Sequence, residues 1–172
     1  LSKNLFKNRG EIEDDLIIHS KMLIKQNNYG QRGLHDGNKR KQFIGVLAEN
    51  IVRKFLKKDL MSVNGKDSGY DISYFKYKAD IKAMERKVRP RENHVNNILD
   101  IQMKHKADAF IFSSLNVSEK MLTICGWIPK KDFKELAKFY KKGTERVRDD
   151  GTSFKSFADL WELENKYLYP VL

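Results

Sequence analysis

Two acidic residues and a lysine stand in neighbouring segments that have the composition of β-strands. Asp71 lies in the first segment, and Asp80 and Lys82 lie in the second. Two carboxylates held close together repel each other unless a cation lies between them. Oxygen ligands of this kind select Mg²⁺ or Mn²⁺, which binds through one or two carboxylates, water and a substrate phosphate. Such a metal generates hydroxide, and a nearby lysine can orient water or offset developing charge, so these residue types suit phosphodiester hydrolysis.

The two segments predict a β-hairpin. Residues 70–75 and 79–84 are rich in β-branched and aromatic side chains, and a polar stretch at 76–78 separates them. Residues two apart in a strand share a face, so Asp80 and Lys82 point the same way. The carbonyl of Ile81, between them, can also reach a metal held there.

The place of Asp71 depends on the length of the hairpin loop. A two-residue loop at 76–77, or a four-residue loop at 75–78, places Asp71 directly opposite Lys82, and opposed residues share a face. A loop with an odd number of residues would put Asp71 on the other face. The sequence therefore predicts the cluster for an even-numbered loop.

The strongest helical pattern of the chain precedes this hairpin. From residue 39 to residue 58, apolar side chains recur at three- and four-residue spacings. Glu49 stands at the margin of the apolar face, close to Gly45 and Val52. The side chain of a residue at that margin can extend along the sheet toward a site. Glu49 is therefore a candidate fourth member of the cluster that contains Asp71, Asp80 and Lys82.

The remaining pattern predicts an α/β fold with a mixed central β-sheet flanked by helices. Further helices are expected at 11–27, at 94–105, from Pro129 to about residue 142, and at 156–164. Buried strands are expected at 107–113 and 121–128.

The hairpin motif is similar to that of a known family. Gly69-Tyr-Asp71-Ile72, followed by Ala79-Asp80-Ile81-Lys82, resembles the PD-(D/E)XK, or restriction-endonuclease-like, nuclease superfamily. That superfamily places one acid on a strand and an acid-x-lysine on the next, and an earlier helix often supplies another acid, where Glu49 stands here. The chain departs from the commonest form of the motif in having Tyr70 where proline is frequent and Asp80 where glutamate is more frequent.

The resemblance implies a single nuclease domain over residues 1–172. Its restriction-endonuclease-like core would cover about 39–128, with helical extensions at 1–38 and 129–172. It also implies that Asp71, Asp80, Glu49 and the carbonyl of Ile81 hold Mg²⁺ or Mn²⁺. Lys82 would then act on water or phosphate.

A second acid-x-lysine stands close by, in Glu85-Arg86-Lys87. It ranks lower as the catalytic pair because Glu85 and Lys87 fall on the strand face shared with Ile81.

The charge of the chain favours a polyanionic partner. The sequence has 34 Lys and Arg against 23 Asp and Glu, a net charge of +11 over 172 residues. The basic run that follows the hairpin is expected to contact phosphates, and some superfamily branches use a glutamine or lysine about 20 residues beyond the motif. The expected nucleic-acid contacts are Arg86, Lys87, Arg89, Arg91, Gln102 and Lys104.

The expected substrate is therefore DNA, double-stranded or branched, and a homodimer would allow cuts in both strands. The alternative is a non-catalytic module that binds nucleic acid through its basic surface alone. The lone Cys125 fits a reducing compartment, such as the cytoplasm of a prokaryotic or phage-infected cell. We expect no signal segment and no membrane span, because no apolar stretch approaches the ~20 residues that a span requires.

Overall fold

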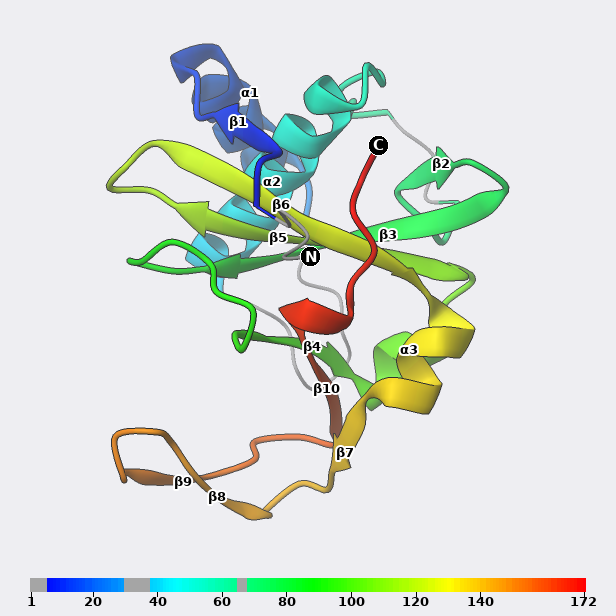
Figure 1. Ribbon diagram of the computed structural model, residues 1–172. Helices are drawn as coiled ribbons and strands as arrows, with labels where there is room; N and C mark the ends of the chain where they lie inside the picture. Colours follow the sequence, from blue (N-terminus) through cyan, green and yellow to red (C-terminus); the bar gives the residue numbers. More distant parts are fainter. Residues whose placement is uncertain (1–5, 30–37, 65–67) are drawn as a thin grey trace.

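A five-stranded mixed sheet forms the middle of the molecule. The computed structural model describes residues 6–29, 38–64 and 68–172, and the strand order of this sheet is β1-β6-β5-β3-β2 (Figure 1). β3 and β5 run parallel, whereas the other neighbours run antiparallel, so the mixed α/β prediction is confirmed. The strands are β1 (Arg9–Glu11), β2 (Ile72–Tyr74), β3 (Tyr77–Glu85), β5 (Ala109–Asn116) and β6 (Met121–Pro129).

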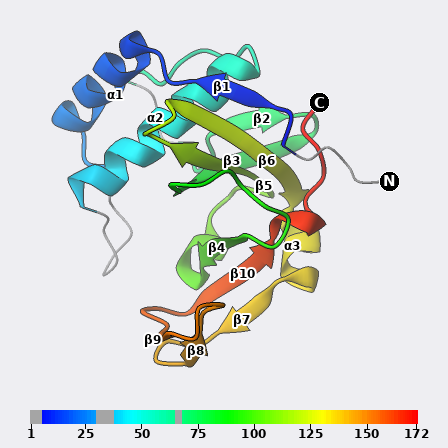
Figure 2. The same ribbon diagram turned by 60° about the vertical axis from the view of Figure 1, so that its left-hand side comes forward.

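Two helices cover one face of this sheet (Figures 1 and 2). They are α1 (Asp14–Gln26) and α2 (Lys39–Phe55), and both confirm helices expected from the sequence. α2 begins after Asn38, whose side chain accepts a hydrogen bond from the N–H of Lys41. The apolar face of α2 packs on the sheet in one buried core, where Leu47 and Ile51 join Ile81 and Ile111.

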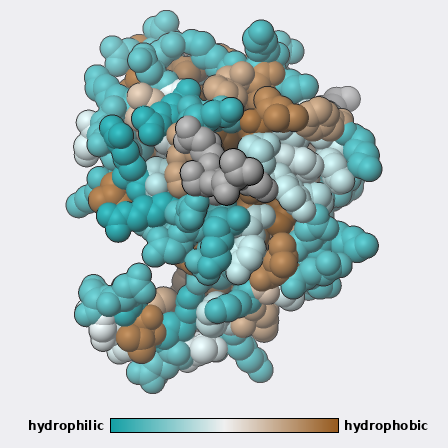
Figure 3. Space-filling model, viewed as in Figure 1, coloured by the Kyte–Doolittle hydropathy of each residue, from teal (hydrophilic) through white to brown (hydrophobic). Residues whose placement is uncertain are grey.

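A smaller sheet lies beyond the opposite face (Figure 2). Its order is β4-β10-β7, and a second buried core, which includes Phe110, Phe112 and Phe133, separates it from the main sheet. A two-stranded hairpin projects from this end of the molecule (Figures 1 and 3). The elements are β4 (Val95–Leu99), the 3₁₀ helix η2 (Asp100–Lys104), α3 (Lys130–Leu136), β7 (Lys138–Tyr140), the projecting β8 (Glu145–Val147) and β9 (Ser153–Lys155), β10 (Leu160–Glu164) and the 3₁₀ helix η3 (Asn165–Tyr167).

Three helices expected from the sequence are wrong in whole or in part. Residues 94–105 form β4 and η2, residues 156–164 include β10, and the helix expected to reach residue 142 ends at Leu136. These segments are strands because they pair with distant parts of the chain. β4 pairs with β10, about 65 residues later, and β7 pairs with β10 as well. Apolar spacing within a short window cannot reveal such a partner. The region after residue 129 therefore carries more strand than α-helix and is not a helical extension.

The hairpin that carries the acidic residues has an even-numbered loop, in a position one residue earlier than expected. Tyr74 pairs with Tyr77, and Ile72 pairs with Ala79, so the loop consists of Phe75 and Lys76. The ladder ends at the Ile72–Ala79 pair, and the N–H of Asp71 also donates to the carbonyl of Ala79, so Asp71 does not lie opposite Lys82. The expected parity is confirmed, and the expected partner of Asp71 is wrong.

In the described part of the chain, no helix combines the length and apolar character that crossing a membrane requires.

Candidate metal and phosphate site

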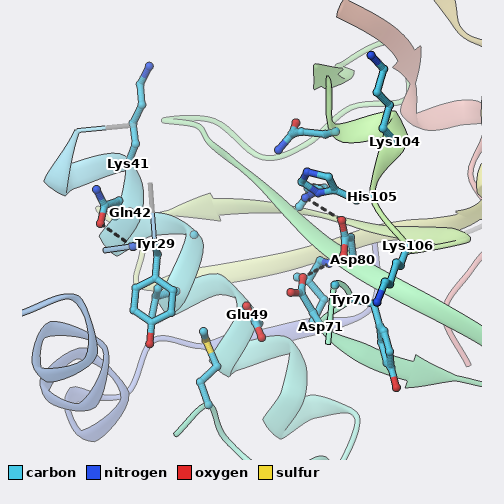
Figure 4. Close-up of a pocket in the computed structure, with 17 residues that line it drawn as sticks. Tyr29, Lys41, Gln42, Glu49, Tyr70, Asp71, Asp80, Lys104, His105 and Lys106 are labelled. Atoms are coloured by element: carbon cyan, nitrogen blue, oxygen red, sulfur yellow. Dashed lines mark hydrogen bonds and ion pairs between the residues drawn. The ribbon is translucent and has the colours of Figure 1, made fainter. Parts of the chain in front are cut away.

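The predicted catalytic residues line one cavity of about 450 Å³ (Figure 4). The cavity lies between the amino-terminal half of α2, the edge of β3 and the segment around η2. Its lining includes seven residues singled out from the sequence: Glu49, Asp71, Asp80, Ile81, Lys82, Gln102 and Lys104. Residues from four separate parts of the chain therefore line one cavity.

Asp80 and Lys82 lie on the face of β3 that is turned away from α2. Their partners on β5 are Phe110 and Phe112, which belong to the core on that side of the sheet. Asp80 is 5% exposed, and the Nζ atom of Lys82 lies 3.2 Å from its Oδ2 atom. The buried carboxylate thus has a cation beside it, as a buried charge requires.

Asp71 approaches the same strand from its edge. β2 begins at Ile72, so Asp71 is the residue just before this strand. The Oδ2 atom of Asp71 accepts a hydrogen bond of 2.6 Å from the N–H of Ile81. The N–H and C=O of a residue in an antiparallel ladder point to the same side. The carbonyl of Ile81 therefore faces the same edge as the carboxylate of Asp71.

Glu49 reaches the cavity from α2. It is 9% exposed, and its Oε1 atom accepts a hydrogen bond of 2.8 Å from the Nε atom of Arg53, one turn along the helix. Burial raises the pKa of Glu49, whereas the guanidinium of Arg53 lowers it. The margin position predicted for Glu49 therefore does place its side chain in the cavity.

The three carboxylates affect one another electrostatically. Burial, and then the charges of Glu49 and Asp80, raise the pKa of Asp71 to about 8, although Lys82 and the Ile81 N–H lower it. Figure 4 shows the carboxylates of Glu49, Asp71 and Asp80 gathered in the middle of the cavity. Acidic groups that repel one another in a buried site favour a bound cation, because a cation relieves both the repulsion and the burial of charge.

The donor set suits a hard divalent cation that keeps part of its water. Within the described ranges, no three His, Cys, Asp or Glu side chains converge to hold a metal ion by themselves. Mg²⁺ does not need such a cage, since it is usually bound by one or two carboxylates, water and phosphate. Asp71, Asp80 and the carbonyl of Ile81 carry oxygen atoms of the type that such a cation accepts.

Basic side chains surround this acidic centre. Lys41 lies on one side of the cavity, and Lys104, His105 and Lys106 lie on the other (Figure 4). Sequence reasoning missed Lys41, His105 and Lys106. The spacing of Lys41, Gly45 and Glu49, four residues each along one helix, could have indicated Lys41. His105 ends the segment that was expected to be helical, and Lys106 follows it.

The segment 104–106, which carries three of these basic residues, is held by hydrogen bonds from Lys130 and by packing against Gly69. The Nζ atom of Lys130 donates hydrogen bonds to the carbonyls of Met103 (3.1 Å) and His105 (2.7 Å). The side chain of Lys106 passes over Gly69, where an added Cβ would lie 3.1 Å from its Cδ atom. A glycine at 69, with a φ of +76°, therefore leaves room for this lysine.

Two of the predicted nucleic-acid contacts line the cavity, and four do not. Gln102 is buried, with its Oε1 atom accepting a hydrogen bond of 3.1 Å from the N–H of Leu99, and Lys104 is exposed at the rim. Arg86, by contrast, donates to the carbonyl of Val95. The predicted contacts outside the cavity lining are Arg86, Lys87, Arg89 and Arg91.

The competing acid-x-lysine does not reach this site. Glu85 is exposed and pairs with Arg40 at the surface, and neither Glu85 nor Lys87 lines the cavity. The geometry favours Asp80 and Lys82 over this pair.

No protein-family model, no curated protein and no solved structure matches the chain. What bears on its function is the geometry of the cavity.

Proposed function

We propose that the chain is a metal-dependent nuclease that hydrolyses phosphodiester bonds in DNA. The observation that carries this proposal is the meeting of Glu49, Asp71, Asp80 and Lys82 in one cavity with a basic rim. An acidic centre suits a divalent cation, and the surrounding lysines suit the phosphates of a polyanionic substrate.

Each residue has a role in this proposal. Asp71, Asp80 and the carbonyl of Ile81 would hold Mg²⁺ or Mn²⁺, which supplies Lewis acidity toward phosphate and water when bound. Lys82, held 3.2 Å from Asp80, orients the attacking water or offsets charge that develops on the phosphate. Glu49, with one oxygen committed to Arg53, would accept a hydrogen bond from water, or would help to hold the metal, through its other oxygen.

The rim residues position the substrate. Lys41 and Lys104, on opposite sides of the cavity, would contact phosphates on either side of the bond that is cut. The buried Gln102 uses its carbonyl oxygen within the protein, so its amide group is the part available to a substrate.

The arrangement of the elements supports a restriction-endonuclease-like core. A hairpin, β2–β3, carries the acids, β3 continues beside a parallel neighbour, and α2 lies across the face of the same sheet. This is the order of elements that the motif implies for the superfamily.

A non-catalytic nucleic-acid-binding module is the alternative, and the net charge of +11 favours it. The buried acids distinguish the two functions. Negative charge in the centre of a basic surface weakens the binding of DNA, so a module without catalysis would bind more tightly when Asp80 is neutralised, and would have no use for these acids. A nuclease needs them to hold its metal.

Cleavage assays test the proposal. Supercoiled, linear duplex and branched DNA are incubated with Mg²⁺ or Mn²⁺ and with the wild type, Asp80→Ala, Lys82→Ala or the control Glu85→Gln, which changes an exposed acid on the same strand. We expect cleavage by the wild type and the control alone. Metal-dependent cleavage that survives both site substitutions would contradict the site, and binding without cleavage of any DNA form would favour the alternative.

A further inference from the structure

Arg53 joins three segments of the chain at the edge of the acidic centre. Its Nε atom donates to the Oε1 atom of Glu49 (2.8 Å), and its Nη2 atom donates to the backbone carbonyl of Asp71 (2.6 Å). Its Nη1 atom donates to the backbone carbonyl of Asp59, at 3.2 Å, in the segment that follows α2. All three guanidinium nitrogens are therefore engaged.

Two of these contacts act on residues of the proposed metal site. The contact with Glu49 fixes one carboxylate oxygen on the helix side of the cavity. The contact with Asp71 fixes the backbone at the point where the chain enters β2, and thereby the position from which its carboxylate reaches the N–H of Ile81. One side chain thus sets the separation of two acids that come from different elements.

We propose that Arg53 is a positioning residue that holds Glu49 and Asp71 in the geometry that binds the divalent cation. This inference rests on the proposed function. Arg53 does not line the cavity itself, so it acts through the two acids and not on the substrate. Groups that orient metal ligands in this way typically change metal affinity by about 10- to 100-fold when they are removed.

The geometry requires arginine and not just a positive charge. A planar guanidinium presents donors in fixed directions, so it can hold a carboxylate and two carbonyls at once. A lysine at this position keeps the charge beside Glu49 but has one flexible ammonium group, which cannot satisfy three acceptors on three segments. Arg53→Lys should therefore behave like Arg53→Met in metal binding and not like the wild type.

The same helix provides a matched control. Arg40 also pairs with an acid of β3, Glu85, but this pair is exposed and does not line the cavity. Arg40→Met removes a pair of the same chemical kind on the same helix. It should leave metal binding unchanged.

Direct measurement of Mn²⁺ binding tests the inference. Dissociation constants are obtained by titration calorimetry and electron paramagnetic resonance for the wild type, Asp71→Asn, Arg53→Lys, Arg53→Met and Arg40→Met, each shown to be folded by circular dichroism. We expect Asp71→Asn to lose binding, and both Arg53 variants to weaken it by about 10-fold or more. We expect Arg40→Met to match the wild type.

The possible results separate the inference from the function it rests on. Wild-type protein without Mn²⁺ binding, or binding that survives Asp71→Asn, would contradict the proposed function. Binding that is lost in Asp71→Asn but unchanged in Arg53→Lys would overturn the role of Arg53 and leave the function standing. Arg53→Lys decides the matter if Arg53→Met does not fold, because it retains the charge that the buried Glu49 needs.

Discussion

The carboxylate of Asp71 accepts a hydrogen bond from the backbone N–H of Ile81, with 2.6 Å between Oδ2 and N. The N–H of Ile81 therefore bonds to a side-chain carboxylate. In a longer β2, a backbone carbonyl would accept this hydrogen bond at the edge of β3. This replacement brings a carboxylate to the strand that carries Asp80 and Lys82, and it is the structural basis of the acidic centre.

The raised pKa of Asp71 predicts how stability depends on pH in the absence of metal. An unfolded chain releases this proton near the ordinary value of 3.8, whereas the folded protein keeps it up to about 8. Between these values the folded state binds more protons, so stability falls as pH rises, by at most about 1.4 kcal/mol per pH unit for one proton. Urea unfolding of metal-free wild type and Asp71→Asn at several pH values between 5 and 9 measures this, and the slope should be shallower in the variant. Equal slopes would show that Asp71 titrates normally.

Metal binding should release protons and become tighter as pH rises toward 8. A cation binds the ionised form of Asp71, so at lower pH it must displace a proton. Calorimetric Mn²⁺ titrations at pH 6.5 and 8.5, in two buffers of different ionisation enthalpy, measure both the affinity and the protons released. An affinity that does not change between these two pH values would argue against Asp71 as a ligand.

The basic rim should contribute more to DNA binding than the loop after β3. Lys104→Met removes a rim lysine, whereas Lys87→Met removes an exposed lysine that does not line the cavity. Each phosphate contact that is lost should lower the slope of log K against log salt by about 0.9. Fluorescence anisotropy in Ca²⁺ over a range of salt concentrations measures this slope, and we expect the larger change for Lys104→Met. The reverse order would place the DNA on the loop that the basic run in the sequence suggested.

The smaller sheet should depend on one buried amide pair. The Nδ2 atom of Asn96 on β4 donates to the Oδ1 atom of Asn165 (2.7 Å) and to the carbonyl of Leu163 (3.3 Å). Asn96→Ala leaves these buried acceptors without their donor, which should cost about 1–3 kcal/mol in the free energy of unfolding. Ser118→Ala, at an exposed position, is the control for the denaturation experiment. A cost below about 0.5 kcal/mol would contradict the role of this amide pair in the smaller sheet.

The sequence predicted the parts of this fold whose partners are close in the chain. The helix at 39–58, the hairpin and the two buried strands that follow have strong local patterns, and Glu49 could be assigned from its place on a helical face. β4 and β10 could not be predicted in this way, because each takes its conformation from a partner about 65 residues away.

The acidic residues of the candidate site could be predicted from the sequence, whereas most of the residues around them could not. The motif identified Asp71, Asp80 and Lys82, but the exact loop position, and hence the partner of Asp71, depended on Phe75 adopting a positive φ of 50°. Phe is an unusual residue for that conformation, which Gly, Asn and Asp favour. Arg53 was missed because two of its three contacts are with backbone carbonyls, for which residue types give no signal.

In the proposed nuclease, Asp80 belongs to a metal-dependent catalytic centre. Single-turnover cleavage of end-labelled duplex DNA, with enzyme in excess and Mg²⁺ varied, tests it most directly in wild type, Asp80→Asn and Glu85→Gln. We predict that the rate in wild type and Glu85→Gln rises with Mg²⁺ to a plateau, and that Asp80→Asn is slower by at least about 100-fold while it still binds DNA. Equal Mg²⁺-dependent rates in Asp80→Asn and wild type would contradict the claim.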